Sequence, residues 1–202
     1  MGKKRDEKRD EKRDIVIITD GDDVARKAIE EVAKNVGGRC ISRSAGNPTP
    51  LSGIEIIEQI KKAKYDPVLV MFDDNGNGDV GDGEKALAYV ANHSDVNVLG
   101  IVAVASNTPM VDGVDVDLCV NLNGEVVDYA VDKDGKPQKN QPPHIFGDTV
   151  DVLQQIEAPF VVGVGDIGKM HGRDHYIHGA PITTKAVEII LERSGYGGNQ
   201  NT

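Results

Sequence analysis

Residues 15–38 read IVIITDGDDVARKAIEEVAKNVGG. Their first five residues are apolar or β-branched, which is typical of a strand buried on both faces. Apolar residues then recur with helical spacing from Val24 to Val36, which predicts a helix over 22–36. Gly37 and Gly38 follow where glycine commonly ends a helix in the left-handed conformation. A buried strand followed by an amphipathic helix is the repeating unit of a parallel α/β sheet.

The same alternation continues along the chain. We expect further strands at 39–42, 67–72, 96–105 and 159–164, and further helices at 53–64, 84–92, 148–156 and 183–193. The fold class is therefore predicted to be α/β, with a mostly parallel sheet and helices on both faces in a Rossmann-like or Toprim-like three-layer arrangement. Segments 114–122 and 125–131 are joined by Asn123-Gly124, so a small antiparallel hairpin insertion is expected over about 112–146.

The ends of the chain differ in composition from the middle. Residues 3–14 read KKRDEKRDEKRD, with seven basic and five acidic side chains and nothing to bury, so residues 1–14 are predicted to be a disordered charged arm. An interaction arm is the alternative. Residues 15–195 are expected to form a single α/β domain, and residues 196–202, rich in Gly and Asn, a flexible tail.

Composition excludes several classes of protein. The net charge is -10 and there is no Trp, so neither a nucleic-acid backbone nor a stack of bases is an expected partner. The longest apolar run, 98–105, is too short to cross a membrane, and no apolar stretch follows the charged arm as it would in a signal peptide. Cys40 and Cys119 have no partners at metal-ligand spacing, which favours free thiols in a reducing cell. We expect a soluble intracellular chain that meets a membrane only indirectly.

Acidic side chains follow three of the predicted strands. Asp20 and Asp22 follow the first, Asp73 and Asp74 the third, and Asp166 the late strand at 159–164. Parallel strands would place these carboxylates at one edge of the sheet, where α/β proteins bind ligands. Hard oxygen ligands suit Ca²⁺ or Mg²⁺, so these five residues are the candidate metal ligands. For Asp22 and its neighbour Asp23, capping of the next helix is an equally good interpretation.

Two other motifs carry weaker signals. Gly163, Gly165 and Gly168 have the spacing G-x-G-x-x-G after a strand, but no long helix begins there, as a dinucleotide site would require. His171, His175 and His178 could form a transition-metal cluster, although a solvated loop is the favoured interpretation. No Ser has a His and Asp partner that the sequence can identify, so no catalytic residue is predicted and the balance is against an enzyme.

Several blocks of the sequence resemble the stage V sporulation protein AE family, in its soluble SpoVAEa-type form. They are Ile18-Thr-Asp-Gly-Asp-Asp23, residues 38–50, Pro67-Val-Leu-Val-Met-Phe-Asp-Asp74, residues 100–109, 147–153, 163–170 and 179–186. The resemblance runs from about Ile15 to Gly195 and leaves out the charged arm.

This resemblance implies a non-enzymatic accessory subunit of the system that moves dipicolinic acid, as its calcium chelate, into and out of the bacterial spore. It implies a role in sporulation and germination, synthesis in the forespore cytoplasm, and a peripheral position at the spore inner membrane. The implied partners are the other subunits of the dipicolinate channel. Self-association into a homo-oligomer stays open, and the family supplies no catalytic residues.

A shorter likeness concerns Toprim domains of primases and topoisomerases. Thr19-Asp-Gly-Asp22, with Arg26 to Ala28 behind it, is similar to their Asp-x-Asp segment, which binds Mg²⁺ for phosphoryl transfer. The pattern also needs a glutamate after an earlier strand, and no strand precedes Ile15. A Mg²⁺-dependent Toprim-like phosphoesterase or nucleic-acid enzyme is therefore the alternative function, and a nucleotide-binding module at residues 163–168 ranks below both.

Overall fold

The computed structural model describes residues 12–74, 81–106, 112–138, 140–147 and 149–197. Residues 1–11 of the predicted charged arm and 198–202 of the predicted tail therefore lie outside the described residues, whereas Arg13 and Asp14 belong to the first strand of the sheet and not to a disordered arm. The glycine-rich stretch 75–80 after the third strand also lies outside the described residues.

The described residues form a mostly parallel seven-stranded sheet in the order β2-β3-β1-β4-β11-β6-β7. Its strands are β1 (Arg13–Ile18), β2 (Arg39–Cys40), β3 (Val68–Met71), β4 (Val96–Val104), β6 (Leu118–Val120), β7 (Val126–Val127) and β11 (Val161–Val164). Four α-helices accompany it, namely α1 (Asp23–Asn35), α2 (Gly53–Lys62), α3 (Asp82–Ala91) and α4 (Pro181–Arg193). The predicted α/β class is confirmed.

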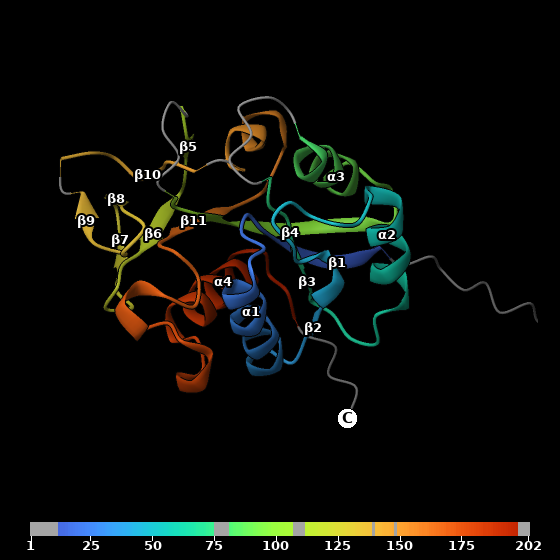
Figure 1. The fold of residues 1–202 in the computed structure, drawn as a ribbon, viewed down its shortest axis with the longest axis horizontal. Coiled ribbons are helices and arrows are strands. Elements are labelled where there is room, and N and C mark those ends of the chain that lie inside the picture. Colours follow the sequence, from blue (N-terminus) through green and yellow to red (C-terminus); the bar gives the residue numbers. More distant parts are fainter. Residues whose placement is uncertain (1–11, 75–80, 107–111, 139, 148, 198–202) are drawn as a thin grey trace, which may run out of the picture.

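Alternating side chains of the central strands enter two separate cores. In β1, Ile15 and Ile17 pack on the face covered by α2 and α3, whereas Val16 and Ile18 pack on the face covered by α1 and α4 (Figure 1). Successive side chains of a strand point to opposite faces, so a strand that is apolar throughout must be covered on both. The sheet and its two helical layers follow from this pattern, as predicted.

Local signals fix where the helices begin. Asp22 caps α1 by accepting hydrogen bonds from the N–H groups of Val24 and Ala25, both at 2.8 Å. Ser52 and Glu55 form a reciprocal capping box at the start of α2. The capping interpretation of Asp22 is therefore confirmed.

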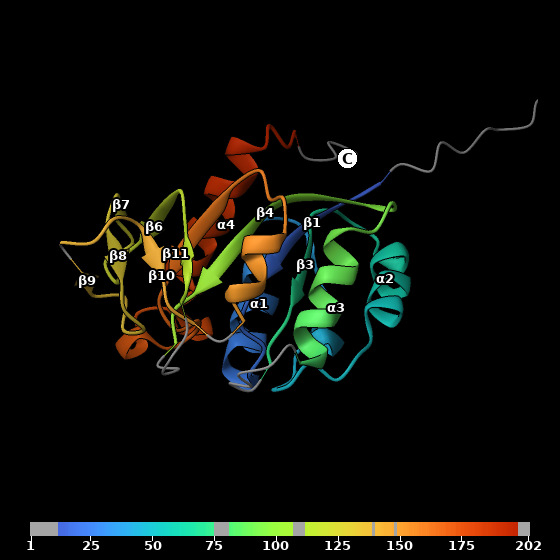
Figure 2. The ribbon, with the colours of Figure 1, turned by 90° about the horizontal axis from the view of Figure 1, so that it is seen from above.

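The insertion is more closely joined to the sheet than we expected. β6 and β7 form the predicted hairpin, with Cys119 opposite Val127, and Gly124 takes the positive φ of the turn. However, β6 also pairs in parallel with β11 and so extends the main sheet, because Cys119 and Val120 are fully buried apolar residues. Two small antiparallel pairs complete this end of the molecule (Figure 2): β5 (Val114–Asp115) with β10 (His144–Ile145), and β8 (Ala130–Val131) with β9 (Pro137–Gln138).

The α-helix predicted over 148–156 is wrong. A short 3-10 helix, η2 (Asp151–Gln155), stands there instead, and residue 148 lies outside the described part. No side chain caps its start, and i→i+3 hydrogen bonds from Leu153 to Val150 and from Ile156 to Leu153 close its turns. An uncapped segment with β-branched residues at 150 and 152 has little to favour a full α-helix.

Three further 3-10 helices lie in the connections. They are η1 (Ser42–Ser44), η3 (Met170–Gly172) and η4 (Tyr176–His178). The last two replace the simple loop expected between Lys169 and His178. Asp174 holds this connection in place, as described below.

Candidate functional site

A crevice of about 220 Å³ opens at the carboxyl ends of the central strands. It lies where β1 and β4 are neighbours, and the chain leaves this pair in opposite directions along the sheet, from β1 to β2 on one side and from β4 to β6 on the other. Such a switch in strand order is the usual ligand position of an open α/β sheet. We call it the acidic crevice; it is lined by Thr19, Asp20, Asp22, Asn47, Asp73, residues 104–106, Lys133, Asp166 and Lys169.

The wall formed by β1 is fixed to β4 by Thr19. Its N–H donates to the carbonyl of Val102 at 3.1 Å, and its Oγ1 accepts from the N–H of Val104 at 2.9 Å. The side chain of Asp20 therefore leaves the sheet at a set position, and its Oδ1 accepts a long hydrogen bond, 3.3 Å, from the N–H of Asp22.

Four of the five predicted carboxylates meet at this crevice. Asp20, Asp22, Asp73 and Asp166 line it, coming from three separate strand ends as the parallel sheet predicts. Asp74 does not line it. Its buried carboxylate accepts hydrogen bonds from the N–H groups of Gly81 and Gly83 and so fixes the start of α3.

Lys169 is the main charged partner inside the crevice. Its Nζ lies 2.7 Å from Asp22 Oδ2 and 2.9 Å from Asp166 Oδ1, so one ammonium joins two of the four carboxylates. Burial opposes the charge on Lys169, but the two carboxylates raise its pKa above the ordinary value. The place where a bound cation would neutralise these two acids is thus taken by a side chain of the protein.

The pKa values of the carboxyl groups in the crevice are shifted in different directions. Burial raises the pKa of Asp20 to about 8, and the neighbouring charges of Asp22, Asp166 and Asp73 add to the effect. Burial also raises the pKa of Asp166, partly offset by Lys169. For Asp22 burial acts in the same direction, but the hydrogen bonds from Lys169 and from the start of α1 outweigh it and lower the pKa. A pKa of about 8 keeps the proton on Asp20 at pH 7, and beside it the Lys169 ammonium contacts both Asp22 and Asp166.

The other candidate motifs have structural roles. A side chain at Gly165 would meet the carbonyl of Lys133 at 2.8 Å, and Gly168 has a positive φ and packs against Val24 of α1. The next α-helix begins only at Pro181, so these glycines do not open onto a helix N-terminus.

The three histidines do not form one cluster, although the rings of His175 and His178 lie edge to face with centroids 6.4 Å apart. His171 Nε2 faces Asp134 Oδ2 at 3.5 Å, whereas His175 Nδ1 accepts from the N–H of Ile177 at 3.3 Å. Throughout the described part of the chain, no three His, Cys, Asp or Glu side chains are placed to hold a metal ion. Cys40 and Cys119 are both free, as expected, and burial raises the pKa of each thiol to about 12.

Sequence reasoning missed Lys169, Lys133 and Asp174. Lys169 follows the glycine motif directly, and its spacing of three from Asp166 was an available signal. No sequence signal pointed to Asp174, because it stands in a polar stretch. In the structure its side chain is nevertheless fully buried. Its carboxylate accepts from the N–H groups of Gly168, Ile182 and Thr183 and from the Thr183 hydroxyl, so it joins the loop that carries Lys169 to the start of α4.

Comparison with known proteins gives a family match. A family model described as SpoVAE, stage V sporulation protein AE1, matches residues 14–194. No curated protein and no solved structure matches the chain. The matched range contains every residue of the acidic crevice. Among the described residues, no helix has both the length and the apolar character needed to cross a membrane.

Proposed function

The chain belongs to the SpoVAE family of stage V sporulation proteins, and from that premise we propose that it is a non-enzymatic accessory subunit of the spore calcium-dipicolinate channel. The match over nearly the whole chain carries this proposal, since it joins the fold and the crevice to a role in sporulation. In this role the protein is made in the forespore, acts in sporulation and germination, and sits at the spore inner membrane through integral partner subunits.

The chemistry of the crevice favours this role over catalysis. Two of its carboxylates are ion-paired with Lys169, and a third, Asp20, is neutral at pH 7. Metal-dependent phosphoryl transfer needs ionised carboxylates that are open to the metal. No observation on the described residues favours the Toprim-like alternative.

The test of the accessory role is made on fractionated spores. An epitope-tagged chain should sediment with the inner membrane when the integral channel subunits are present and should move to the soluble fraction when they are deleted. A soluble cytoplasmic protein of the spore serves as the control. A chain that stays soluble in both strains, or stays with the membrane in both, would contradict the proposal.

We also propose that the acidic crevice is the place where Ca²⁺ or Mg²⁺ would act on this subunit, with Asp20, Asp22, Asp73 and Asp166 as ligands. Their side chains must move to bind the ion, because no three acids of the described residues are placed to hold one as they stand. Because Lys169 occupies two of these carboxylates, a cation must displace its ammonium. Calorimetric titration with Ca²⁺ should therefore show tighter binding by Lys169→Met and weaker binding by Asp20→Asn. Asp74→Asn, which changes an acid outside the crevice, is the control. Equal heats of binding from the wild type and all three variants would show that the crevice does not bind the cation.

A further inference from the structure

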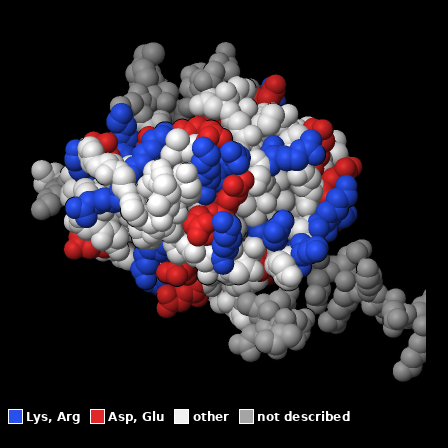
Figure 3. All heavy atoms as spheres, turned by 60° about the horizontal axis from the view of Figure 1, so that its bottom comes forward, with Lys and Arg blue, Asp and Glu red and all other residues white. Residues whose placement is uncertain are grey.

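A basic groove lies at the β2 edge of the sheet. It has a volume of about 420 Å³ and runs between β2, η1 and the C-terminal half of α2. Its charged lining residues are Arg39, Arg43 and Lys62, and no carboxylate of the described part of the chain lines it. This is unusual in a chain with 33 acidic and 23 basic side chains. Figure 3 shows several Lys and Arg side chains on this side of the molecule, with acidic ones beside them.

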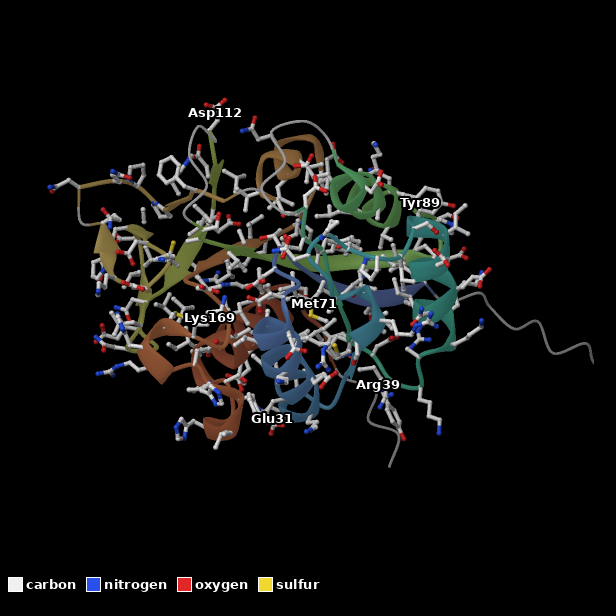
Figure 4. The ribbon with its side chains drawn as sticks, in the orientation of Figure 1. Glu31, Arg39, Met71, Tyr89, Asp112 and Lys169 are labelled. Carbon is white, nitrogen blue, oxygen red and sulfur yellow. The ribbon has the colours of Figure 1, made fainter. Side chains whose placement is uncertain are left out.

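The two arginines of the groove differ from others in the structure. Arg13 is bound to Asp66, and Arg26 to Asp23 and Glu30. By contrast, the guanidinium group of neither Arg39 nor Arg43 forms a hydrogen bond or ion pair with any residue that the structure describes, and both residues are exposed. Figure 4 shows Arg39 beside β2, on the other side of α1 from Lys169. The planar guanidinium group suits bidentate binding of a carboxylate, so two such groups in one groove fit an acidic ligand.

The backbone at this edge has donors to offer as well. The N–H groups of Arg39 and Ile41 donate to Pro67 and Leu69 of the β3 segment. Alternate N–H groups of a strand point to opposite sides, so the N–H of Cys40 faces the free edge. Among the described residues β2 pairs only with β3, and it is the last strand of the sheet on this side. An open edge of this kind can accept an extended segment of another chain.

Acidic side chains around the basic groove favour a narrow ligand, such as an extended peptide, over a broad anionic surface. Glu30 lies within electrostatic range of Cys40, and Glu55 within range of Arg43. Glu58 is exposed on α2 one turn before Lys62 and faces it at 3.8 Å. A broad anionic surface such as a membrane would bring its charges against these acids, whereas an extended peptide meets the cations of the groove alone.

We propose that the basic groove docks an acidic, extended segment of a partner protein, which pairs with the free edge of β2 and places its carboxylates on Arg39 and Arg43. Binding at this edge does not depend on the function proposed for the acidic crevice. Its failure would leave the channel role untouched.

The test uses a fluorescein-labelled peptide of alternating Glu and Val residues with blocked ends, and a matched peptide of alternating Lys and Val. Fluorescence anisotropy with the full-length protein should show that only the acidic peptide binds and that salt weakens the binding. Arg39→Glu/Arg43→Glu should weaken it about tenfold, as expected when close charge pairs across an interface are reversed. Arg173→Glu/Lys185→Glu makes the same change of charge on exposed residues elsewhere and is the control.

Three outcomes would overturn the proposal. The first is equal binding of the two peptides, and the second is an equal loss in the groove variant and the control variant. The third comes from sedimentation with phosphatidylglycerol vesicles. If the groove variant loses vesicle binding and keeps peptide binding, the groove is a membrane contact and not a peptide site. Circular dichroism of both variants establishes that each is folded.

Discussion

Replacement of Asp20 by Asn should change how the stability of the protein depends on pH. Burial and the nearby acids raise the pKa of Asp20 from 3.8 to about 8 in the folded protein. Between these values the unfolded chain has released the proton and the folded protein still holds it. The contribution of the Asp20 carboxyl group to the free energy of unfolding is therefore fully present below pH 4 and is lost as the pH rises toward 8. The slope is about 1.4 kcal/mol per pH unit, which gives roughly 3 kcal/mol between pH 5 and pH 7.

The Asp20→Asn variant lacks this dependence, because its amide resembles the neutral carboxyl group and does not titrate. We expect its free energy of unfolding, relative to that of the wild type, to rise by roughly 3 kcal/mol from pH 5 to pH 7 and to level off above pH 8. Urea unfolding followed by circular dichroism at several pH values, in the presence of EDTA, measures the difference.

The exposed neighbour Asp23 provides the control for this experiment. Its ion pairs with Lys27 and Arg26 lower its pKa to about 2, so it is ionised in both the folded and the unfolded states above pH 5. Asp23→Asn should differ from the wild type by the same amount at every pH from 5 to 8. If Asp20→Asn behaves in the same way, Asp20 is ionised at neutral pH and the account of the crevice is wrong.

Three further predictions follow from the same geometry. Asp174→Asn should lower the free energy of unfolding by about 2–4 kcal/mol, because a buried amide cannot accept all the hydrogen bonds that the carboxylate receives; a loss below that of Thr183→Val in chemical unfolding would count against it. Asp22→Ala should lower the free energy of unfolding by about 1 kcal/mol because the cap of α1 is lost, and Asp22→Ser should restore most of that stability. Equal unfolding midpoints for the two variants would argue against the cap. Lys169→Met should raise the pKa of Asp22, measured from its carboxyl ¹³C shift, and an unchanged pKa would show that the ion pair is absent in solution.

Much of the fold could be predicted because it rests on local patterns. The apolar runs at 15–19 and 96–105 must be covered on both sides, which already requires helices on both faces of the sheet. The same topology predicts that acids following β1, β3 and β11 meet at one edge, as Asp20, Asp73 and Asp166 do.

Other features depend on contacts that no local pattern encodes. Asp74 stands next to Asp73, but the chain turns so that its carboxylate meets the N–H groups at the start of α3 instead of the crevice. Lys169 pairs with Asp22, which is 147 positions away in the sequence. The parallel pairing of β6 with β11 likewise joins segments that a hairpin signal alone would keep apart.

The accessory role proposed for this chain can be tested by the rate of dipicolinate release during germination. It should be measured in spores that lack this chain and in spores where the chain has been restored from a second locus. Release should be slower without the chain and normal after restoration, with spore number and core dehydration checked in parallel. Release at the wild-type rate from spores that lack the chain would contradict the role proposed for it.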